Sequence, residues 1–142
     1  MTYRSLHHEP TRTSEESAAV RGEPLANGAK ALVIKVDDRF SLFVMSAARR
    51  LDAGAVRRRF GAKGSRFANP DELMALTGLV PGSVPPFGHP LFDLDCYVDP
   101  SVLERPRIAF NAASLTDSVI LDPADYARVA IFESFPFTRD AE

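Results

Sequence analysis

Two consecutive apolar runs, residues 29–37 and 39–47, constrain the fold of this chain more than any other feature. Both runs are rich in β-branched and aromatic residues, and both place apolar side chains at neighbouring positions. Asp37 and Asp38 lie at their junction and predict a hairpin turn. A strand that is apolar on both faces lies in the interior, either in a barrel or in a sheet that helices cover. The sequence therefore predicts two central antiparallel strands that are covered on both sides.

Short helices and further strands are expected around this hairpin. Residues with capping side chains precede the predicted helices, and these caps are Thr13, Asp52, Asn69, Asp99 and Asp122. Strand patterns cover residues 65–68, 92–98, 107–111 and 115–121, and residues 131–137 can add an edge strand. Residues 1–12 are expected to form a loosely ordered arm. We predict one domain over residues 1–142, an α+β fold built as a mixed β-barrel of about six to seven strands with short peripheral helices.

The net charge of the chain is −2, so no global positive field attracts nucleic acid. Charge is unevenly distributed, because seven arginines and lysines between residues 49 and 66 stand against a single acid, Asp52. The centre of this run comprises Arg57, Arg58, Arg59 and Lys63. Two interpretations remain open: a solvated helix face, or a patch that contacts nucleic-acid phosphates.

Cysteine and histidine usage gives no indication of a metal or cofactor site. Cys96 is the only cysteine and lies on the apolar side of a strand pattern, where a buried, inert thiol is expected. His7 and His8 adjoin on the polar arm, and His89 is far from them in the sequence. No metal-ligand spacing results, so we predict no metal and no cofactor. The N-terminal residues carry no apolar signal core and no run is long enough to span a membrane, so a cytoplasmic protein is expected.

The segment Gly82-Ser83-Val84-Pro85-Pro86-Phe87-Gly88 is the strongest local motif. Gly82 permits positive φ, and two consecutive prolines fix their own φ and remove two amide donors. Such a loop is either a rigid turn that leads into a strand or a grip for a small polar ligand. Lys30 stands at the mouth of the first apolar strand. It can hold its ammonium at the edge of a pocket, or it can simply extend from a strand end into solvent.

Four segments, taken together, resemble a known family. They are GAKALVIK at 28–35, RFANPDEL at 66–73, TGLVPGSVPPFG at 77–88 and FNAAS at 110–114. In order and spacing they look like the YbaK/prolyl-tRNA-synthetase-associated family, bacterial domains that deacylate mischarged tRNA in trans, and the similarity runs from about His8 to Val129. The resemblance implies a mixed β-barrel with a cleft between the lysine strand and the G-x-x-x-P loop.

The resemblance also implies the roles of individual residues. Lys30 and Gly82 take catalytic positions, since fixed amides and an ammonium can stabilise the negative charge that develops during ester hydrolysis. The implied substrate-binding residues are Ser83, Val84, Pro85, Pro86, Phe87, Asn111, Ala113 and Ser114. The expected partner is the acceptor end of an aminoacylated tRNA, with Arg57, Arg58, Arg59 and Lys63 as nucleic-acid-binding residues and an aminoacyl-tRNA synthetase as a further partner.

One segment departs from the family pattern. Many relatives carry Gly-Ser-His where this chain has Ala113, Ser114 and Leu115, which predicts a tighter and less polar wall that favours small aminoacyl groups such as alanyl or seryl. The function that follows is a deacylase for tRNA mischarged with a small amino acid. Two alternatives remain open: a non-catalytic binding module of the same fold, and a hydrolase of small esters or thioesters.

Overall fold

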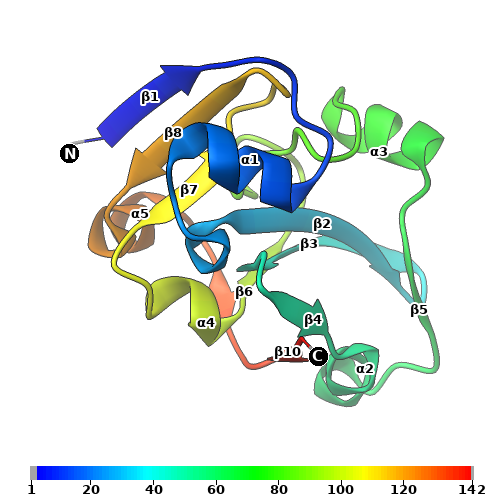
Figure 1. Ribbon diagram of the computed structural model, residues 1–142. Coiled ribbons are helices and arrows are strands. Elements are labelled where there is room, and N and C mark those ends of the chain that lie inside the picture. Colours follow the sequence, from blue (N-terminus) through cyan, green and yellow to red (C-terminus); the bar gives the residue numbers. More distant parts are fainter. Residues whose placement is uncertain (1–2, 142) are drawn as a thin grey trace.

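The computed structural model describes residues 3–141, and within them lie ten strands, five α-helices and one 3₁₀ helix (Figure 1). The strands are β1 (Tyr3–His7), β2 (Ala29–Val36), β3 (Arg39–Ser46), β4 (Arg49–Leu51), β5 (Ser65–Phe67), β6 (Cys96–Val98), β7 (Ile108–Asn111), β8 (Asp117–Leu121), β9 (Glu133–Ser134) and β10 (Thr138–Asp140). The helices are α1 (Ser14–Arg21), η1 (Leu25–Asn27), α2 (Ala53–Phe60), α3 (Pro70–Thr77), α4 (Pro100–Leu103) and α5 (Pro123–Val129).

The strands form three open sheets. The largest has the order β5-β2-β3-β6-β9 and is mixed, because β2 is antiparallel to β3 and β5 whereas β6 is parallel to both β3 and β9. A second sheet has the antiparallel order β1-β8-β7, and β4 pairs with β10 in a third. A single parallel bridge between Gly28 and Ala109 joins the strand ends of the first two sheets. That junction brings β2 next to β7.

The α+β class is confirmed, but the predicted barrel is wrong. None of the three sheets closes on itself within residues 3–141, since β5 and β9 are free edges of the large sheet and β1 and β7 are edges of the second. The apolar patterns show that both faces of the central strands are covered. They do not show whether a closed barrel or separate packed sheets provide the cover, because that depends on long-range pairing of edges.

The core explains why β2 and β3 are apolar on both faces. On one side Val33, Leu42 and Val44 join the large cluster that lies under the second sheet and α5. On the other side Ile34 and Phe43 join a smaller, aromatic-rich cluster that α2 and the C-terminal segment cover. Every residue of β3 from 41 to 46 is buried, so this strand is the centre of the fold, as the sequence predicted.

Local signals predicted most element boundaries correctly. The hairpin turns at Asp37, which takes a positive φ of 51°, and each predicted cap side chain accepts a hydrogen bond from the first turn of its helix. The strand predicted over 92–98 is shorter, since the Phe92 amide folds back onto the Gly88 carbonyl and only Cys96–Val98 pairs. In the described residues no helix combines the length and apolarity that crossing a membrane requires.

The predicted N-terminal arm needs a correction. Residues 3–7 form β1, which pairs in antiparallel register with β8 from Tyr3 opposite Leu121 to His7 opposite Asp117, while residues 1–2 lie outside the described part of the chain. Most β1 side chains are exposed, so this edge strand lacks the apolar alternation that reveals a half-buried strand. Backbone pairing with β8 orders the segment instead.

Candidate active site

A cleft opens where α1, the start of β2 and the Gly82–Gly88 loop meet. Its volume is about 160 Å³, close to that of a cavity that holds benzene, so it has room for a small organic group. Beside Ala47 in the turn after β3, four parts of the chain line it. They contribute Thr11, Ser17 and Arg21 from α1 and the segment before it, Lys30 from β2, Gly82 and Val84 from the loop, and Asn111 and Leu115 from the end of β7 and beyond.

Lys30 lies at the edge of this cleft. It stands opposite Met45 in the β2–β3 pairing, is half-buried, and forms no ion pair among residues 3–141. Lys30 also borders a second groove, which Arg49, Arg50 and Arg139 line. Its ammonium is therefore a charge without a protein counter-ion at the junction of two surface hollows. Such a charge is available to an electron-rich ligand.

Gly82 and Val84 are the two loop residues that line the cleft. Gly82 has a φ of +86°, a conformation that glycine adopts without strain. The Ser83 amide and hydroxyl both turn away to the Val80 carbonyl, at 3.2 and 2.8 Å. Within the described chain, the N–H groups of Gly82 and Val84 have no hydrogen-bond partner. Both residues thus keep a backbone donor that no other described group uses.

The remaining loop residues support the cleft from behind. Ser83, Pro85 and Pro86 are buried and do not line it. The buried Tyr126 hydroxyl donates to the Pro86 carbonyl at 2.6 Å, and the Phe87 ring packs edge-on against Phe110. These contacts hold the loop in one conformation. Of the five predicted substrate-binding residues from 83 to 87, the structure places only Val84 at the cleft surface.

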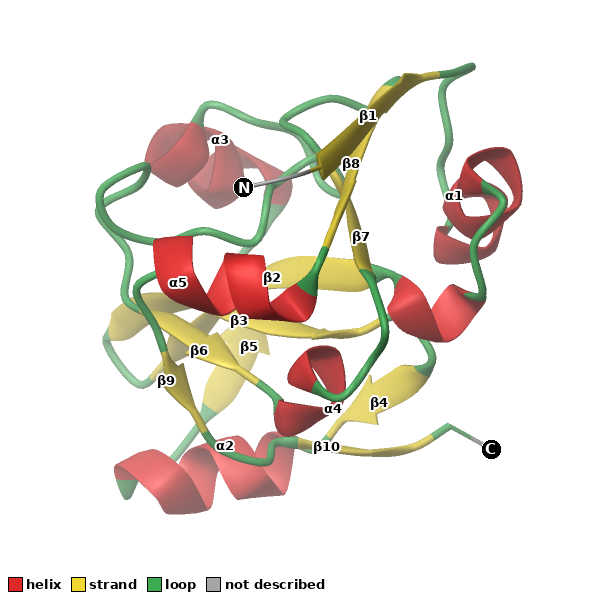
Figure 2. Ribbon diagram, turned by 90° about the vertical axis from the view of Figure 1, so that its left-hand side faces the viewer, coloured by secondary structure: helices red, strands yellow, loops and turns green. Residues whose placement is uncertain are grey.

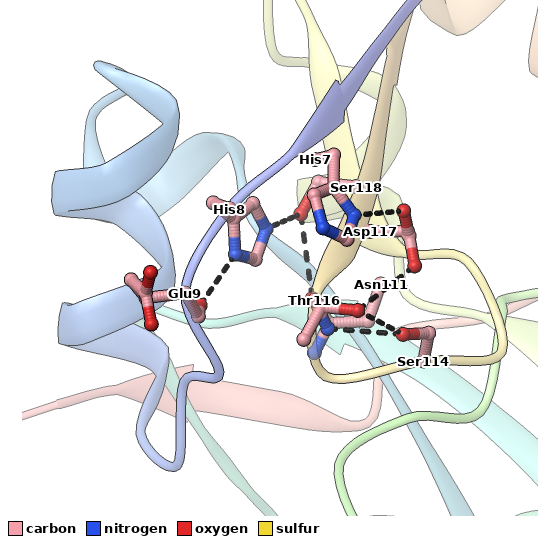
Figure 3. Close-up of polar contacts among 8 residues, drawn as sticks. All are labelled: His7, His8, Glu9, Asn111, Ser114, Thr116, Asp117 and Ser118. Atoms are coloured by element: carbon pink, nitrogen blue, oxygen red, sulfur yellow. Dashed lines mark hydrogen bonds and ion pairs between the residues drawn. The ribbon is translucent and has the colours of Figure 1, made fainter.

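Asn111 joins the loop to α1 through a chain of hydrogen bonds. Its Nδ2 donates to the Gly82 carbonyl at 2.6 Å, and its Oδ1 accepts from Arg21 Nη2 at 2.9 Å. Arg21 Nε donates to Ser118 Oγ at 2.9 Å. His8 lies on the other side of Ser118, with Nε2 at 2.8 Å from Ser118 Oγ and Nδ1 at 2.8 Å from the Glu9 carbonyl (Figure 3). Asn111 therefore connects the conformation of the Gly82 loop to α1, β1 and β8.

In the segment 113–115, which departs from the family pattern, one residue lines the cleft and the other two lie outside it. Leu115 lines the cleft, and its side chain lies 3.7 Å from the position that a Cβ on Gly82 would occupy. Ala113 is exposed, does not line the cleft, and has a φ of 62°, which is strained for any residue but glycine. Ser114 accepts from the Thr116 amide at 3.0 Å and also lies outside the cleft. Ala113 thus costs backbone strain without narrowing the pocket.

The predicted cationic patch is not part of the cleft. Arg57, Arg58 and Arg59 belong to α2, which lies at the opposite end of the molecule from α1 in both views (Figures 1 and 2). Arg59 pairs with Glu133 at 3.2 Å, and Arg58 lies 3.9 Å from Asp52. Lys63 is exposed just beyond this helix. Contact of these residues with nucleic acid stays a prediction.

Sequence reasoning missed Arg21, Thr11 and Ser17. All three are at least nine-tenths buried, with exposed fractions of 9%, 3% and 5%. In the sequence, Arg21 is a basic residue in the last turn of α1, where such side chains complement the helix dipole and are commonly exposed. The available signal is spacing, since Ser14, Ser17 and Arg21 recur at i, i+3 and i+7 on one helix face. This polar face is turned toward the cleft.

Other reactive groups are unsuited to catalysis here. Burial raises the pKa of the Cys96 thiol to about 12, so the thiolate nucleophile is absent at neutral pH. Within residues 3–141, no group of three or more His, Cys, Asp or Glu side chains is arranged to hold a metal ion. The groups of the cleft that remain as candidates are the Lys30 ammonium, the Arg21 guanidinium and the backbone of Gly82 and Val84.

Comparison with known proteins defines the class. The family model described as the aminoacyl-tRNA editing domain matches residues 8–129. A protein proposed to be a trans-editing enzyme for prolyl-tRNA synthetase has a solved structure that superposes with a TM-score of 0.85 at 27% identity, covering 96% of this chain and 87% of that one. This chain belongs to the aminoacyl-tRNA editing domain family.

Two relatives of known name are similar to this chain in sequence, a tRNA deacylase and a proline–tRNA ligase. The chain is 39% identical over 145 residues to the multifunctional Ser/Thr-tRNA deacylase ProXp-y of Escherichia coli K12, covering 98% of this chain and 86% of that protein. It is also 35% identical over 101 residues to a proline–tRNA ligase of Shouchella clausii, covering 71% of this chain but only 18% of the ligase. The chain thus resembles both a freestanding deacylase and one segment of a synthetase.

Proposed function

We propose that this chain is an aminoacyl-tRNA deacylase that hydrolyses the ester of tRNA mischarged with a small hydroxylated residue, seryl or threonyl. The observation that carries the proposal is a cleft of about 160 Å³ that combines an unpaired lysine with two free loop amides, in a chain 39% identical to a Ser/Thr-tRNA deacylase. The cleft volume suits the aminoacyl group, while the ribose and base stay outside. Editing is needed because a single methyl group changes binding to a synthetase by only ~1–3 kcal/mol.

The chemistry uses the groups that line the cleft. Water attacks the ester carbonyl carbon, a new C–O bond forms, and negative charge develops on the carbonyl oxygen. The Lys30 ammonium and the amides of Gly82 and Val84 stabilise that charge, because their positions are set before reaction. The bond to the ribose oxygen then breaks, that oxygen takes the proton that the attacking water gives up, and the products are the free amino acid and tRNA. A neighbouring ribose hydroxyl can orient the water, so no protein nucleophile is required.

A panel of mischarged tRNAs tests the proposal. The purified chain is incubated with one tRNA body charged in turn with serine, threonine, alanine, cysteine and proline, and the loss of each ester is followed. We expect rapid loss of the seryl and threonyl esters and survival of the prolyl ester. Survival of all five esters, with tRNA still bound, would establish the non-catalytic binding module instead. Equal hydrolysis of free aminoacyl esters without tRNA would favour the small-ester hydrolase.

The groove beside Lys30 is the best-placed surface for the tRNA backbone. Arg50 and Arg139 face each other in the β4–β10 register, are exposed, and form no ion pair among residues 3–141. Arg49, by contrast, pairs with Asp140 at 2.8 Å. Because Lys30 borders both hollows, a strand that enters the cleft can continue along these arginines. The proline–tRNA ligase relatives support a tRNA for proline and a synthetase partner as further parts of the proposal.

Neutralising the groove should weaken tRNA binding selectively. We expect the Arg50→Gln/Arg139→Gln double variant to bind tRNA more weakly and to lower the slope of log K against log salt by roughly one to two, because phosphate contacts release counterions. Turnover at saturating substrate should change little. The matched control is Arg57→Gln/Arg58→Gln on α2. A salt slope that falls only in the α2 variant would place the tRNA backbone on that helix and contradict the groove assignment.

A further inference from the structure

The end of the cleft formed by α1 and the segment before it is polar, because the buried residues Thr11, Ser17 and Arg21 line it. Thr11 and Ser17 hydroxyls lie 2.8 Å apart at this end, and Arg21 lies beside them on the same wall. Lys30 and the loop residues Gly82 and Val84 come from other parts of the chain that line the cleft, and they are the groups proposed to bind the ester. A group that extends from the ester toward the α1 wall therefore reaches two hydroxyls and a guanidinium.

Arg21 is the unusual member of this set. Two of its five N–H donors are used, by Ser118 and Asn111, and the other three have no partner among residues 3–141. It forms no ion pair in this part of the chain, and Glu23, its nearest acidic residue along the sequence, is bonded to Arg107 at 2.6 Å. Burial lowers the pKa of Arg21 to about 10, which leaves it charged at neutral pH. The unused donors stay within reach of solvent, so an oxygen ligand in the cleft can accept a charge-assisted hydrogen bond from them.

We propose that Arg21, with Thr11 and Ser17, forms a subsite that binds the side-chain hydroxyl of the aminoacyl group and thereby selects seryl and threonyl esters. This inference rests on the proposed deacylase function and assigns its specificity. The α-ammonium of the substrate cannot occupy the subsite, because the guanidinium repels it. An alanyl methyl offers these donors no acceptor. A hydroxyl fits, since it accepts from Arg21 and can also donate to Thr11 or Ser17.

The expected discrimination is large. A site built to bond a substrate hydroxyl rejects an analogue without it far more strongly than an apolar pocket rejects one methylene. We expect kcat/KM for seryl-tRNA to exceed that for alanyl-tRNA by about 10²-fold or more on the same tRNA body. The predicted pocket was less polar at the Leu115 wall, and Leu115 does line the cleft. The cleft as a whole is nevertheless more polar than the sequence predicted, because Thr11, Ser17 and Arg21 line its α1 wall.

Two variants test whether Arg21 and Ser17 bind the substrate hydroxyl or whether Arg21 only holds Asn111 in place. Arg21→Met approximates the unbranched stem of the side chain but removes its donors. It should lower the ratio of kcat/KM for seryl-tRNA to that for alanyl-tRNA to below about 10, because kcat/KM falls for seryl-tRNA alone. Ser17→Ala leaves the bonds from Arg21 to Asn111 and Ser118 in place and should lower the same ratio by a smaller factor. Arg58→Met, which changes an exposed arginine of α2 outside the cleft, is the matched control and should keep the wild-type ratio.

The same variants are measured for binding with seryl and alanyl amides of 3′-amino-3′-deoxyadenosine, which cannot be hydrolysed. Preference for the seryl amide in the wild type, and its loss in Arg21→Met and Ser17→Ala, is the expected result. A folded Arg21→Met variant that loses seryl and alanyl turnover equally would assign Arg21 to support of Asn111 and overturn the proposal. An unchanged ratio in Ser17→Ala together with Arg21→Met would also overturn it. Failure of the wild type to cleave any ester would instead reject the deacylase function itself.

Discussion

Replacing Lys30 with methionine is expected to lower kcat for seryl-tRNA hydrolysis by roughly 10²- to 10³-fold, because one preorganised group at a developing oxyanion contributes about that factor. Methionine keeps most of the apolar stem of the lysine and removes only its charge. Lys30 is half-buried and forms no ion pair among the described residues, so the substitution breaks no salt bridge. The free energy of unfolding should change by less than about 1 kcal/mol.

Lys35→Met is the matched control for this prediction. Lys35 lies on the same strand, but its ammonium lies 5.8 Å from the centre of the Phe40 ring and it does not line the cleft. Single-turnover rates at saturating enzyme isolate the chemical step from tRNA binding. If Lys30→Met and Lys35→Met both retain the wild-type rate, Lys30 is an ordinary strand lysine and takes no part in catalysis.

The second large effect concerns stability. A Cβ added to Gly88 would lie 2.5 Å from the Leu94 carbonyl oxygen and 2.9 Å from the Cys96 Cβ. Neither atom belongs to a flexible side chain, so Gly88→Ala must displace backbone at the point where the functional loop leads into the core. We expect a loss of about 1–3 kcal/mol or more, which corresponds to a Tm lower by roughly 2–4 °C for each kcal/mol.

Gly64→Ala is the control for the Gly88 variant. A Cβ at Gly64 has no other atom within 4 Å, and the residue has no positive φ. The control should keep or slightly raise the Tm, because alanine reduces the conformational entropy of the unfolded chain. Thermal unfolding followed by circular dichroism measures both. Equal Tm values for Gly88→Ala and Gly64→Ala would show that the close approach at Gly88 is absent in solution.

Local signals predicted the parts of the fold that depend on neighbouring residues. Asn69 with Glu72 forms the capping box that begins α3, and Asp37 turns the β2–β3 hairpin. The barrel prediction failed because sheet closure depends on pairing between distant edges. The strand β1 was missed because it is an exposed edge strand with polar residues on both faces, and only its pairing with β8 reveals it.

The sequence likewise indicated those parts of the candidate site that lie in continuous segments, and missed those that depend on contacts between distant residues. Lys30 and Gly82 belong to continuous motifs, and the structure brings both to one cleft. Most residues of the Gly82–Gly88 loop proved to be buried supports, since consecutive residues of a tight loop cannot all face one ligand. Arg21 could not be assigned from the sequence, because its significance depends on Asn111 and Ser118, which are about 90 or more residues away along the chain.

The central claim is that the cleft between Lys30 and the Gly82 loop receives the aminoacyl end of the tRNA. The most direct measurement is backbone amide chemical-shift mapping with the non-hydrolysable seryl amide of 3′-amino-3′-deoxyadenosine. We predict saturable shifts at the amides of Gly82 and Val84 and at residues of α1, with no shifts on α2. Saturable shifts confined to α2, or to the hollow between Arg39 and Tyr97, would contradict the account.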